Sequence, residues 1–338
     1  MYKRLPLALL AAVSVVGLAV GGGASAEAAA APLPVIYNFD IGYIGNIPNA
    51  NKAPAGAITY DAEGRLAACS SPGRLPVILV HGTWEAQGTN WAAGAPLLRN
   101  AGFCVYTFDY GGRPNDVFNG TGPIATSAGQ LGVFIDAVRA ATGSTQVDLV
   151  GHSQGGMMPR YYIKFGSSWT GGAFGAGLSK VRKLIALSPS NHGTTLNGIA
   201  SLGEALGVNP YVAEVQPAAI DQTIGSAFNK KLDSCPGGRP AADICAGDTV
   251  QYTVIQTKGD QVVTPYRNAF LKQNPASSST VTNILLQDSC PLDWVEHMAI
   301  IYDSYAYGFV LKALGIAKPA SVPGASPSCK FILPYEGG

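Results

Sequence analysis

Two apolar patterns alternate along this chain. Short runs rich in apolar residues, some continuous and some alternating with polar residues, are typical of strands and occur at residues 75–80, 103–108, 147–150, 181–187, 251–256 and 281–287. Apolar residues at helical spacing occur at residues 90–100, 124–141, 157–165 and 298–314. Strands that alternate with helices favour right-handed crossovers, which build a mostly parallel sheet with helices on both faces. The expected fold class is therefore α/β.

Residues 196–250 break this alternation. They contain glycine, proline and short amphipathic pieces in place of a strand. We interpret the segment as a small cap over the carboxyl edge of the sheet, where a substrate would bind. A pair of ordinary surface helices is the alternative.

The N-terminus has the pattern of a signal peptide. A Lys-Arg pair precedes an apolar run over residues 5–20, and Ala-Ser-Ala at residues 24–26 is a small-residue cleavage pattern. The run is shorter than the roughly 20 residues that a membrane-spanning helix needs. We therefore expect cleavage of residues 1–26 and a secreted, extracellular protein.

Composition and charge fit a globular chain with no nucleic-acid partner. The 338 residues are 47% hydrophobic and 13% charged, enough for one large domain or two small ones. We expect an irregular extension over residues 27–65, a main domain over residues 66–315 and a tail over residues 316–338. Loss of residues 1–26 removes two positive charges and changes the formal net charge from +1 to −1. The chain has no basic cluster that could neutralise a row of phosphates, so nucleic acid is not an expected partner.

Six cysteines in an exported chain indicate three disulfides, although six allow 15 pairings. Two of them flank a short Pro-Gly-Gly loop, and the last one would hold the C-terminal tail. No Cys-x-x-Cys or Cys/His spacing supports a metal site. Spacing favours three pairs: Cys69 with Cys104, Cys235 with Cys245, and Cys290 with Cys329.

The sequence Gly-His-Ser-Gln-Gly at residues 151–155 lies between a predicted strand and a predicted helix. In such a turn the central residue takes strained backbone angles, and the glycines two positions away relieve the crowding. The hydroxyl of Ser153 is then exposed at the carboxyl end of the strand, as a catalytic nucleophile requires. A glycine-rich turn that matches by chance is the alternative.

A serine hydroxyl needs a base, usually a histidine, because the pKa of imidazole lies near neutrality. The chain has four histidines. His152 adjoins Ser153, so its side chain points away from the hydroxyl, while His81 and His192 follow other strands. His297 follows the last strand on a loop at the same sheet edge, and elimination favours it as the base.

The base in turn needs an acid that holds its tautomer. Asp260 follows a predicted strand and gives the chain order Ser, Asp, His, which suits this architecture. Asp288 and Asp293 are close in sequence to His297 and are the rivals. For a developing oxyanion, the backbone N–H of Gln154 is one donor by position, and Thr83, after His-Gly, supplies a second from a neighbouring loop.

Several stretches resemble secreted actinobacterial triacylglycerol lipases and esterases of the class 2 lipase type. The resemblance covers residues 66–315 and rests on the following motifs: P-V-I-L-V-H-G-T-W (76–84), F-D-Y-G (108–111), V-D-L-V-G-H-S-Q-G-G-M-M-P-R-Y-Y (147–162), S-P-S-N-H-G-T-T (188–195) and G-D-Q-V-V-T-P-Y (259–266). It implies an α/β-hydrolase fold with the cap inserted after the sixth strand, and no cofactor. It also implies a Ser153-Asp260-His297 triad with an oxyanion hole at Thr83 and Gln154.

The expected activity is hydrolysis of carboxylic esters with apolar acyl chains, such as acylglycerols. The expected partners are a lipid or ester substrate and, transiently, a lipid interface, with the protein a monomer. Candidates for an acyl cleft, which are more often core residues, are Trp84, Met157, Met158, Ile199, Leu202 and Leu206. The alternatives are an acyltransferase or a polyester or cutin hydrolase on the same fold, or a binding module without turnover.

Overall fold

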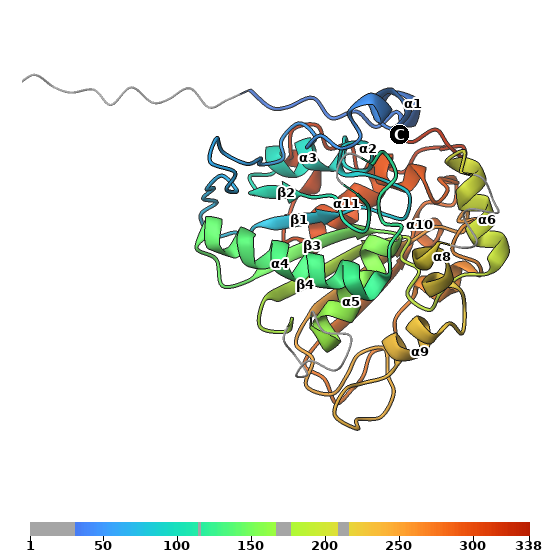
Figure 1. Cartoon of the computed structure of the whole chain (residues 1–338). Coiled ribbons are helices and arrows are strands. Elements are labelled where there is room, and N and C mark those ends of the chain that lie inside the picture. The colour runs from blue at the N-terminus through green and yellow to red at the C-terminus, as the bar shows by residue number, and fades with distance from the viewer. Residues whose placement is uncertain (1–30, 114–115, 167–176, 209–215) are drawn as a thin grey trace, which may run out of the picture. The chain divides into compact units, whose positions relative to one another are not determined.

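A six-stranded parallel sheet forms the centre of the computed structural model (Figure 1). The structure describes residues 31–113, 116–166, 177–208 and 216–338, and residues Pro32–Gly338 form one compact unit. The strands lie in the order β2-β1-β3-β4-β5-β6, and every neighbouring pair is parallel. They are β1 (Val77–Val80), β2 (Val105–Thr107), β3 (Val147–His152), β4 (Val181–Leu187), β5 (Gln251–Gln256) and β6 (Thr280–Leu285). The predicted strands and the mostly parallel sheet are confirmed.

Helices cover both faces of this sheet. The longer ones are α4 (Ile124–Thr142), α5 (Gln154–Phe165), α6 (Leu196–Ala205) and α11 (Ser304–Ala313). The shorter ones are α1 (Phe39–Gly42), η1 (Ile44–Asn49), α2 (Gln87–Asn90), α3 (Gly94–Asn100), α8 (Pro217–Gln222), α9 (Ala227–Asp233), η2 (Tyr266–Ala269), α10 (Leu286–Ser289), η3 (Ala299–Tyr302) and η4 (Pro319–Ser321).

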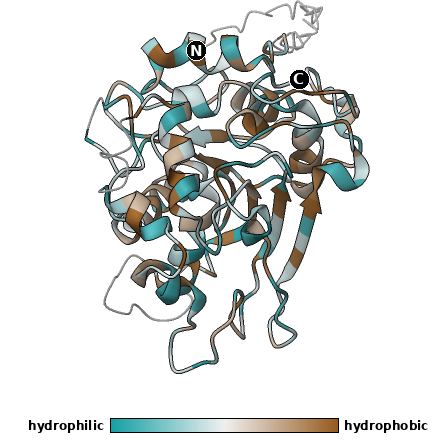
Figure 2. Ribbon diagram, turned by 90° about the vertical axis from the view of Figure 1, so that its right-hand side faces the viewer, coloured by the Kyte–Doolittle hydropathy of each residue, from teal (hydrophilic) through white to brown (hydrophobic). Residues whose placement is uncertain are grey.

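Alternate residues of the strands supply two hydrophobic cores, one on each face. Val77 and Leu79 of β1 pack into a core with residues of α3 and α11. Ile78 and Val80 pack into a second core with residues of α4 and α5. Figure 2 shows the apolar, brown positions gathered on the strands, with hydrophilic, teal positions more frequent on the helices. Because both faces of β1 are buried, its sequence is apolar without interruption, which made it predictable, whereas the edge strand β6 is more exposed and contains polar residues.

The helix predicted over residues 298–314 is wrong in its first part. The chain forms the short η3 there, and α11 begins only at Ser304. The carboxylate of Asp303 accepts hydrogen bonds from the backbone N–H groups of Tyr305 and Ala306, at 2.9 and 3.1 Å. Asp303 is therefore the N-cap residue of α11, and an N-cap of this kind favours the start of a new helix. The strand predicted to continue to residue 287 likewise ends at Leu285, where α10 follows.

The N-terminal extension packs against the end of the chain. The ring of Phe39 lies edge-on to Tyr302, with centroids 5.7 Å apart, and stacks on Tyr43 at 5.1 Å. The backbone N–H of Phe39 donates to the carbonyl of Glu336 at 3.0 Å. Residues near both ends of the described chain are therefore joined by direct contacts.

The segment interpreted as a cap contains α6, α8 and α9, which lie on the right in Figure 1. It follows β4, the fourth strand along the chain, so its predicted place after a sixth strand is wrong. Residues 209–215 of the segment lie outside the described part of the chain. The backbone N–H of Thr194, just after β4, donates to the carbonyl of Gln222 in α8 at 2.8 Å. This bond ties α8 to the loop at the carboxyl end of the sheet.

Three disulfides join the cysteines in the predicted pairs, Cys69–Cys104, Cys235–Cys245 and Cys290–Cys329. The third closes a separation of 39 residues and holds the C-terminal tail, as expected. In the described ranges no helix is long and apolar enough to span a membrane. The predicted signal peptide, residues 1–26, lies outside the described residues.

Candidate active site

Ser153 occupies a strained turn between β3 and α5. Its backbone angles are φ 52° and ψ −122°, a conformation that a residue with a side chain adopts only under tertiary constraint. A Cβ atom at Gly151 would overlap the carbonyl of Gly155, and one at Gly155 would overlap the carbonyl of Val80. Both positions therefore require glycine, and the tight turn predicted from the Gly-x-Ser-x-Gly spacing is present.

The predicted base and acid form a buried pair. Nδ1 of His297 lies 3.0 Å from Oδ2 of Asp260, and neither side chain is exposed. The other carboxylate oxygen of Asp260 accepts the backbone N–H groups of Val262 and Val263, at 2.9 and 2.7 Å. These two bonds fix the orientation of the carboxylate, and the carboxylate fixes the tautomer of the imidazole that carries its proton on Nδ1.

Nε2 of His297 is left free by this arrangement. It is buried and has no hydrogen-bond partner among the described residues. Burial lowers the pKa of His297, but the charge and hydrogen bond of Asp260, together with the charges of Glu296 and Glu85, outweigh it, so the net shift is upward. A free imidazole nitrogen with a raised pKa has the properties of a general base.

His152 brings the base loop next to the serine turn. Nε2 of His152 lies 2.9 Å from the carbonyl oxygen of His297, and the two imidazole rings are 4.9 Å apart. Since Ser153 is the next residue along the chain, this contact places His297 close to the turn. The structure has no hydrogen bond between the Ser153 hydroxyl and Nε2 of His297, a bond that often tightens only when substrate binds.

Thr83 and Gln154 face each other across the turn. The hydroxyl of Thr83 donates to Oε1 of Gln154 at 2.6 Å and accepts from Nε2 of Gln222 at 2.7 Å. Gln154 is the first residue of α5, and the first N–H groups of a helix have no partner within it. The two residues predicted to bind an oxyanion are therefore adjacent, and α8 of the cap contacts Thr83 through Gln222.

The rival residues have other partners. Asp288 is exposed, whereas Asp293 is buried, accepts from the backbone N–H of Val295 at 3.0 Å and interacts with Asp303. Nδ1 of His81 donates to the carbonyl of Gly82 at 2.8 Å, and burial lowers the pKa of its ring. The structure brings none of these side chains to His297.

One group of side chains among the described residues is close enough together to bind a metal ion. It consists of His192, Asp233 and Asp243. Nδ1 of His192 lies 3.3 Å from Asp233 and Nε2 lies 3.4 Å from Asp243. Burial lowers the pKa of His192, but its hydrogen bonds to these two carboxylates raise it to about 9. The carboxylates approach different ring nitrogens, whereas a metal ion binds through one of them. This group fits a protonated histidine between two aspartates rather than a metal centre.

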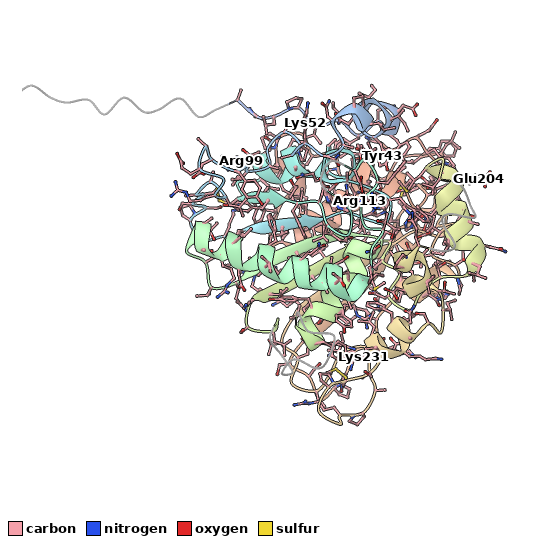
Figure 3. The ribbon with its side chains drawn as sticks, in the orientation of Figure 1. Tyr43, Lys52, Arg99, Arg113, Glu204 and Lys231 are labelled. Carbon is pink, nitrogen blue, oxygen red and sulfur yellow. A yellow bond between two sulfur atoms is a disulfide. The ribbon has the colours of Figure 1, made fainter. Side chains whose placement is uncertain are left out.

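An apolar pocket of about 80 Å³ lies beside Trp84. Trp84 follows Thr83, has a positive φ of 57°, and its indole N–H donates to the side chain of Gln216. Figure 3 labels Tyr43, which lines the pocket, and Glu204 of α6, which precedes the lining residue Ala205. Its lining consists of Tyr43, Ile44, Ile47, Ala50, Trp84, Thr89, Val117, Phe118, Ala205 and Leu206. Four of these, Ile44, Ile47, Val117 and Phe118, are 42–49% exposed, so the pocket opens to solvent.

The other acyl-cleft candidates lie elsewhere. Met157 and Met158 belong to α5 and are fully buried in the core that α4 and α5 form with the sheet. Ile199 and Leu202 are buried in the opposite core and do not line the pocket beside Trp84. They are core residues, the alternative that the sequence left open, whereas Trp84 and Leu206 do line the pocket. A larger groove of about 700 Å³ beside α11 contains none of the predicted site residues.

Sequence reasoning missed two residues that contact the site, Glu85 and Gln222. Glu85 is buried and bonds both Gly82 and His152. The only sequence signal for Glu85 is an acidic residue within an otherwise uncharged stretch after the Thr83 loop. No local pattern marks Gln222, because its contact with Thr83 spans 139 residues.

Comparison with known proteins shows what the central segment is similar to. Residues 74–206 match the family model described as lipase (class 2). The match covers less than half of the chain, and we refer to residues 74–206 as the class 2 lipase segment. The class 2 lipase segment contains the Thr83 loop and the Ser153 turn, while Asp260 and His297 lie beyond it.

Two triacylglycerol lipases are similar to parts of the chain. The one from Burkholderia plantarii is 36% identical over 121 residues, 33% of this chain and 28% of that protein. The one from Pseudarthrobacter phenanthrenivorans is 39% identical over 97 residues, 26% of this chain and 28% of that protein. The matched parts thus span 28% of the length of each of these curated relatives.

The crystal structure of Aspergillus fumigatus lipase B resembles the fold as a whole. It superposes with a TM-score of 0.58 at 23% identity, over 80% of this chain and 57% of that one. The α/β-hydrolase fold expected from the sequence is confirmed by this likeness.

Proposed function

We propose that this protein is a serine carboxylic-ester hydrolase, a lipase or esterase that works through Ser153, Asp260 and His297. The observation that carries the proposal is the buried bond of 3.0 Å between Asp260 and His297, which leaves Nε2 of His297 free beside the turn of Ser153. The class 2 lipase segment supports the same activity.

The proposed reaction has two steps. The hydroxyl of Ser153 attacks the ester carbonyl carbon while Nε2 of His297 takes its proton, and His297 then gives that proton to the departing alcohol. Water, deprotonated by His297, attacks the resulting acyl-enzyme, and the acid leaves as Ser153 regains its proton. The N–H groups of Thr83 and Gln154 would donate to the oxyanion in both steps. Neither step needs a cofactor.

We propose esters of apolar acyl chains, such as acylglycerols, as the substrates. The pocket beside Trp84 supports this choice, because its lining is almost wholly apolar and it adjoins Thr83 in sequence. Its exposed apolar rim, which includes Ile44, Ile47 and Phe118, supports transient contact with a lipid interface. We assign the chemistry to residues 66–315, with the wall of the pocket near Tyr43 supplied by the N-terminal extension.

We also propose that the protein is secreted. Three disulfides support this location, because such bonds persist in oxidising compartments. The leader pattern in the sequence points the same way.

Hydrolysis of p-nitrophenyl esters of graded chain length tests the proposal, with Ser153→Ala as the control. We expect turnover by the wild type and none above the buffer rate with the variant. Equal turnover by both proteins, or none by the folded wild type, would contradict the proposed function.

A further inference from the structure

A second buried imidazole–carboxylate pair lies beneath the serine turn. His152 and Glu85 are 0% and 1% exposed, and Nδ1 of His152 lies 2.8 Å from Oε2 of Glu85. The same carboxylate oxygen accepts the backbone N–H of Gly82 at 2.7 Å. The other ring nitrogen of His152 lies 2.9 Å from the carbonyl oxygen of His297.

The partners of His152 determine where its protons lie. The carbonyl of His297 can only accept, so Nε2 of His152 carries a proton. Glu85 faces Nδ1, and one further proton lies between Nδ1 and Oε2, because two bare acceptors would repel at 2.8 Å. The imidazole of His152 therefore bridges the carboxylate of Glu85 and the carbonyl of His297.

This pair connects three segments of the candidate active site. Gly82 immediately precedes Thr83 of the oxyanion loop, His152 immediately precedes Ser153, and the carbonyl of His297 belongs to the base itself. Asn90 strengthens the first connection, since its Oδ1 also accepts the N–H of Gly82 at 2.9 Å. Gly82 and the carboxylate of Glu85 are in close contact, because a Cβ atom at Gly82 would overlap Oε2 of Glu85.

We propose that Glu85 and His152 are positioning residues, which hold the oxyanion loop and the base loop in register with Ser153. The inference rests on the proposed function, because it presumes that these three segments carry the reacting groups. Neither residue needs to touch the substrate. Displacement of a reacting group by about 1 Å can cost on the order of a hundredfold in rate, so a fixed spacing between the segments matters for turnover.

The test compares steady-state kinetics of Glu85→Ala with the wild type on a soluble ester. Active protein is counted by fluorophosphonate labelling of Ser153, so misfolded molecules do not enter kcat. We expect kcat to fall about tenfold or more and KM to change less than about twofold, because the pair acts on the geometry of the reacting groups. In Glu85→Gln the amide can form a hydrogen bond with the N–H of Gly82 or with Nδ1 of His152, but not with both. We therefore expect a kcat between those of the wild type and Glu85→Ala.

Asp148→Asn is the matched control. Asp148 is fully buried on β3, the strand that ends at His152, and it accepts from Nε of Arg182 at 2.9 Å. The substitution weakens the ion pair between Asp148 and the partly exposed Arg182 of the neighbouring strand β4 without touching the site. We expect a lower Tm but a kcat within about twofold of the wild type, because the effect is on folding alone.

A wild-type kcat in Glu85→Ala, or an equal loss of kcat in Asp148→Asn, would overturn the proposal. If Glu85→Ala does not fold, Glu85→Gln carries the comparison, and an unchanged kcat in that variant contradicts the positioning role. Failure of the proposed function looks different, because the wild type itself would then show neither turnover nor labelling of Ser153.

Discussion

Asp260 and His297 meet through one carboxylate oxygen and Nδ1, 3.0 Å apart and wholly buried. The second carboxylate oxygen is occupied by two backbone N–H groups of the following residues, Val262 and Val263. The acid therefore cannot rotate without loss of hydrogen bonds in a buried position. This rigidity makes the orientation of the His297 ring depend on a single side chain.

Asp260→Asn is expected to lower kcat by about 10⁴-fold, the loss known for the equivalent change in a serine protease triad. The asparagine amide can donate to Nδ1, which would favour the tautomer with its proton on Nε2 and remove the free base nitrogen. Stopped-assay kinetics on a soluble ester measure the effect, with circular dichroism as the check on folding. A loss smaller than about tenfold would exclude Asp260 as the acid of the triad.

The pH dependence of kcat/KM follows from the raised pKa of His297. The base must be neutral, so kcat/KM should rise with pH and level off above an apparent pKa higher than the ordinary value of about 6.5. In Asp260→Ala the burial of His297 is no longer opposed by the carboxylate, so the apparent pKa should move down. A profile with its midpoint below about 6 in the wild type would contradict this assignment.

The sheet and the serine turn were predictable because their causes are local. Strands buried on both faces have continuous apolar sequences, and the turn requires glycines at fixed positions around Ser153. Elimination among four histidines could also find His297, since chain order places it at the correct sheet edge. The strands and the turn are determined by short stretches of sequence, whereas the choice of His297 uses only the order of the elements along the chain.

The remaining features depend on contacts between distant residues. The pocket beside Trp84 joins residues near Tyr43 to the end of α6, and no sequence pattern links the two. The amphipathic pattern of the segment around Leu202 predicted that one face of it is buried. It did not indicate whether a pocket lies beside that face. The sequence indicated that the side chain of His152 points away from the serine, yet its contact with the carbonyl of His297 spans 145 residues.

Ile47→Trp is expected to shorten the range of acyl chains that the protein hydrolyses. Ile47 lines the pocket beside Trp84, so an indole there would fill part of its volume of about 80 Å³. We expect kcat/KM to fall for long-chain esters and to stay within about twofold for acetate, because a methylene in an apolar pocket contributes about 1–3 kcal/mol. Ile41→Trp is the control, since Ile41 is 61% exposed and does not line the pocket. An equal effect of both substitutions would mean that acyl chains bind elsewhere.

The network around His192 should make stability depend on pH. Asp233 and Asp243 raise the pKa of His192 to about 9 against the effect of burial. A histidine whose pKa is raised by folding contributes stability that is complete below its unfolded pKa of about 6.5 and is lost as pH rises through about 9. The difference in unfolding free energy between wild type and His192→Gln should therefore be largest below pH 6.5 and fall towards pH 10.

Urea unfolding at a series of pH values measures that difference. Lys164, whose pKa burial lowers to about 7, titrates in the same window with the opposite sign. Its contribution is present in both proteins, so it cancels to first order in the difference. A difference that stays constant from pH 6 to pH 10 would show that His192 is not protonated between the two aspartates.

The most direct test of the account is the intact mass of the protein after exposure to a fluorophosphonate, in wild type and in Ser153→Ala. An activated serine reacts with this reagent, whereas an ordinary serine hydroxyl does not. The account predicts a single adduct on the wild type and none on the variant. An unmodified, folded wild type, or an adduct that persists in Ser153→Ala, would contradict the claim that Ser153 is the nucleophile.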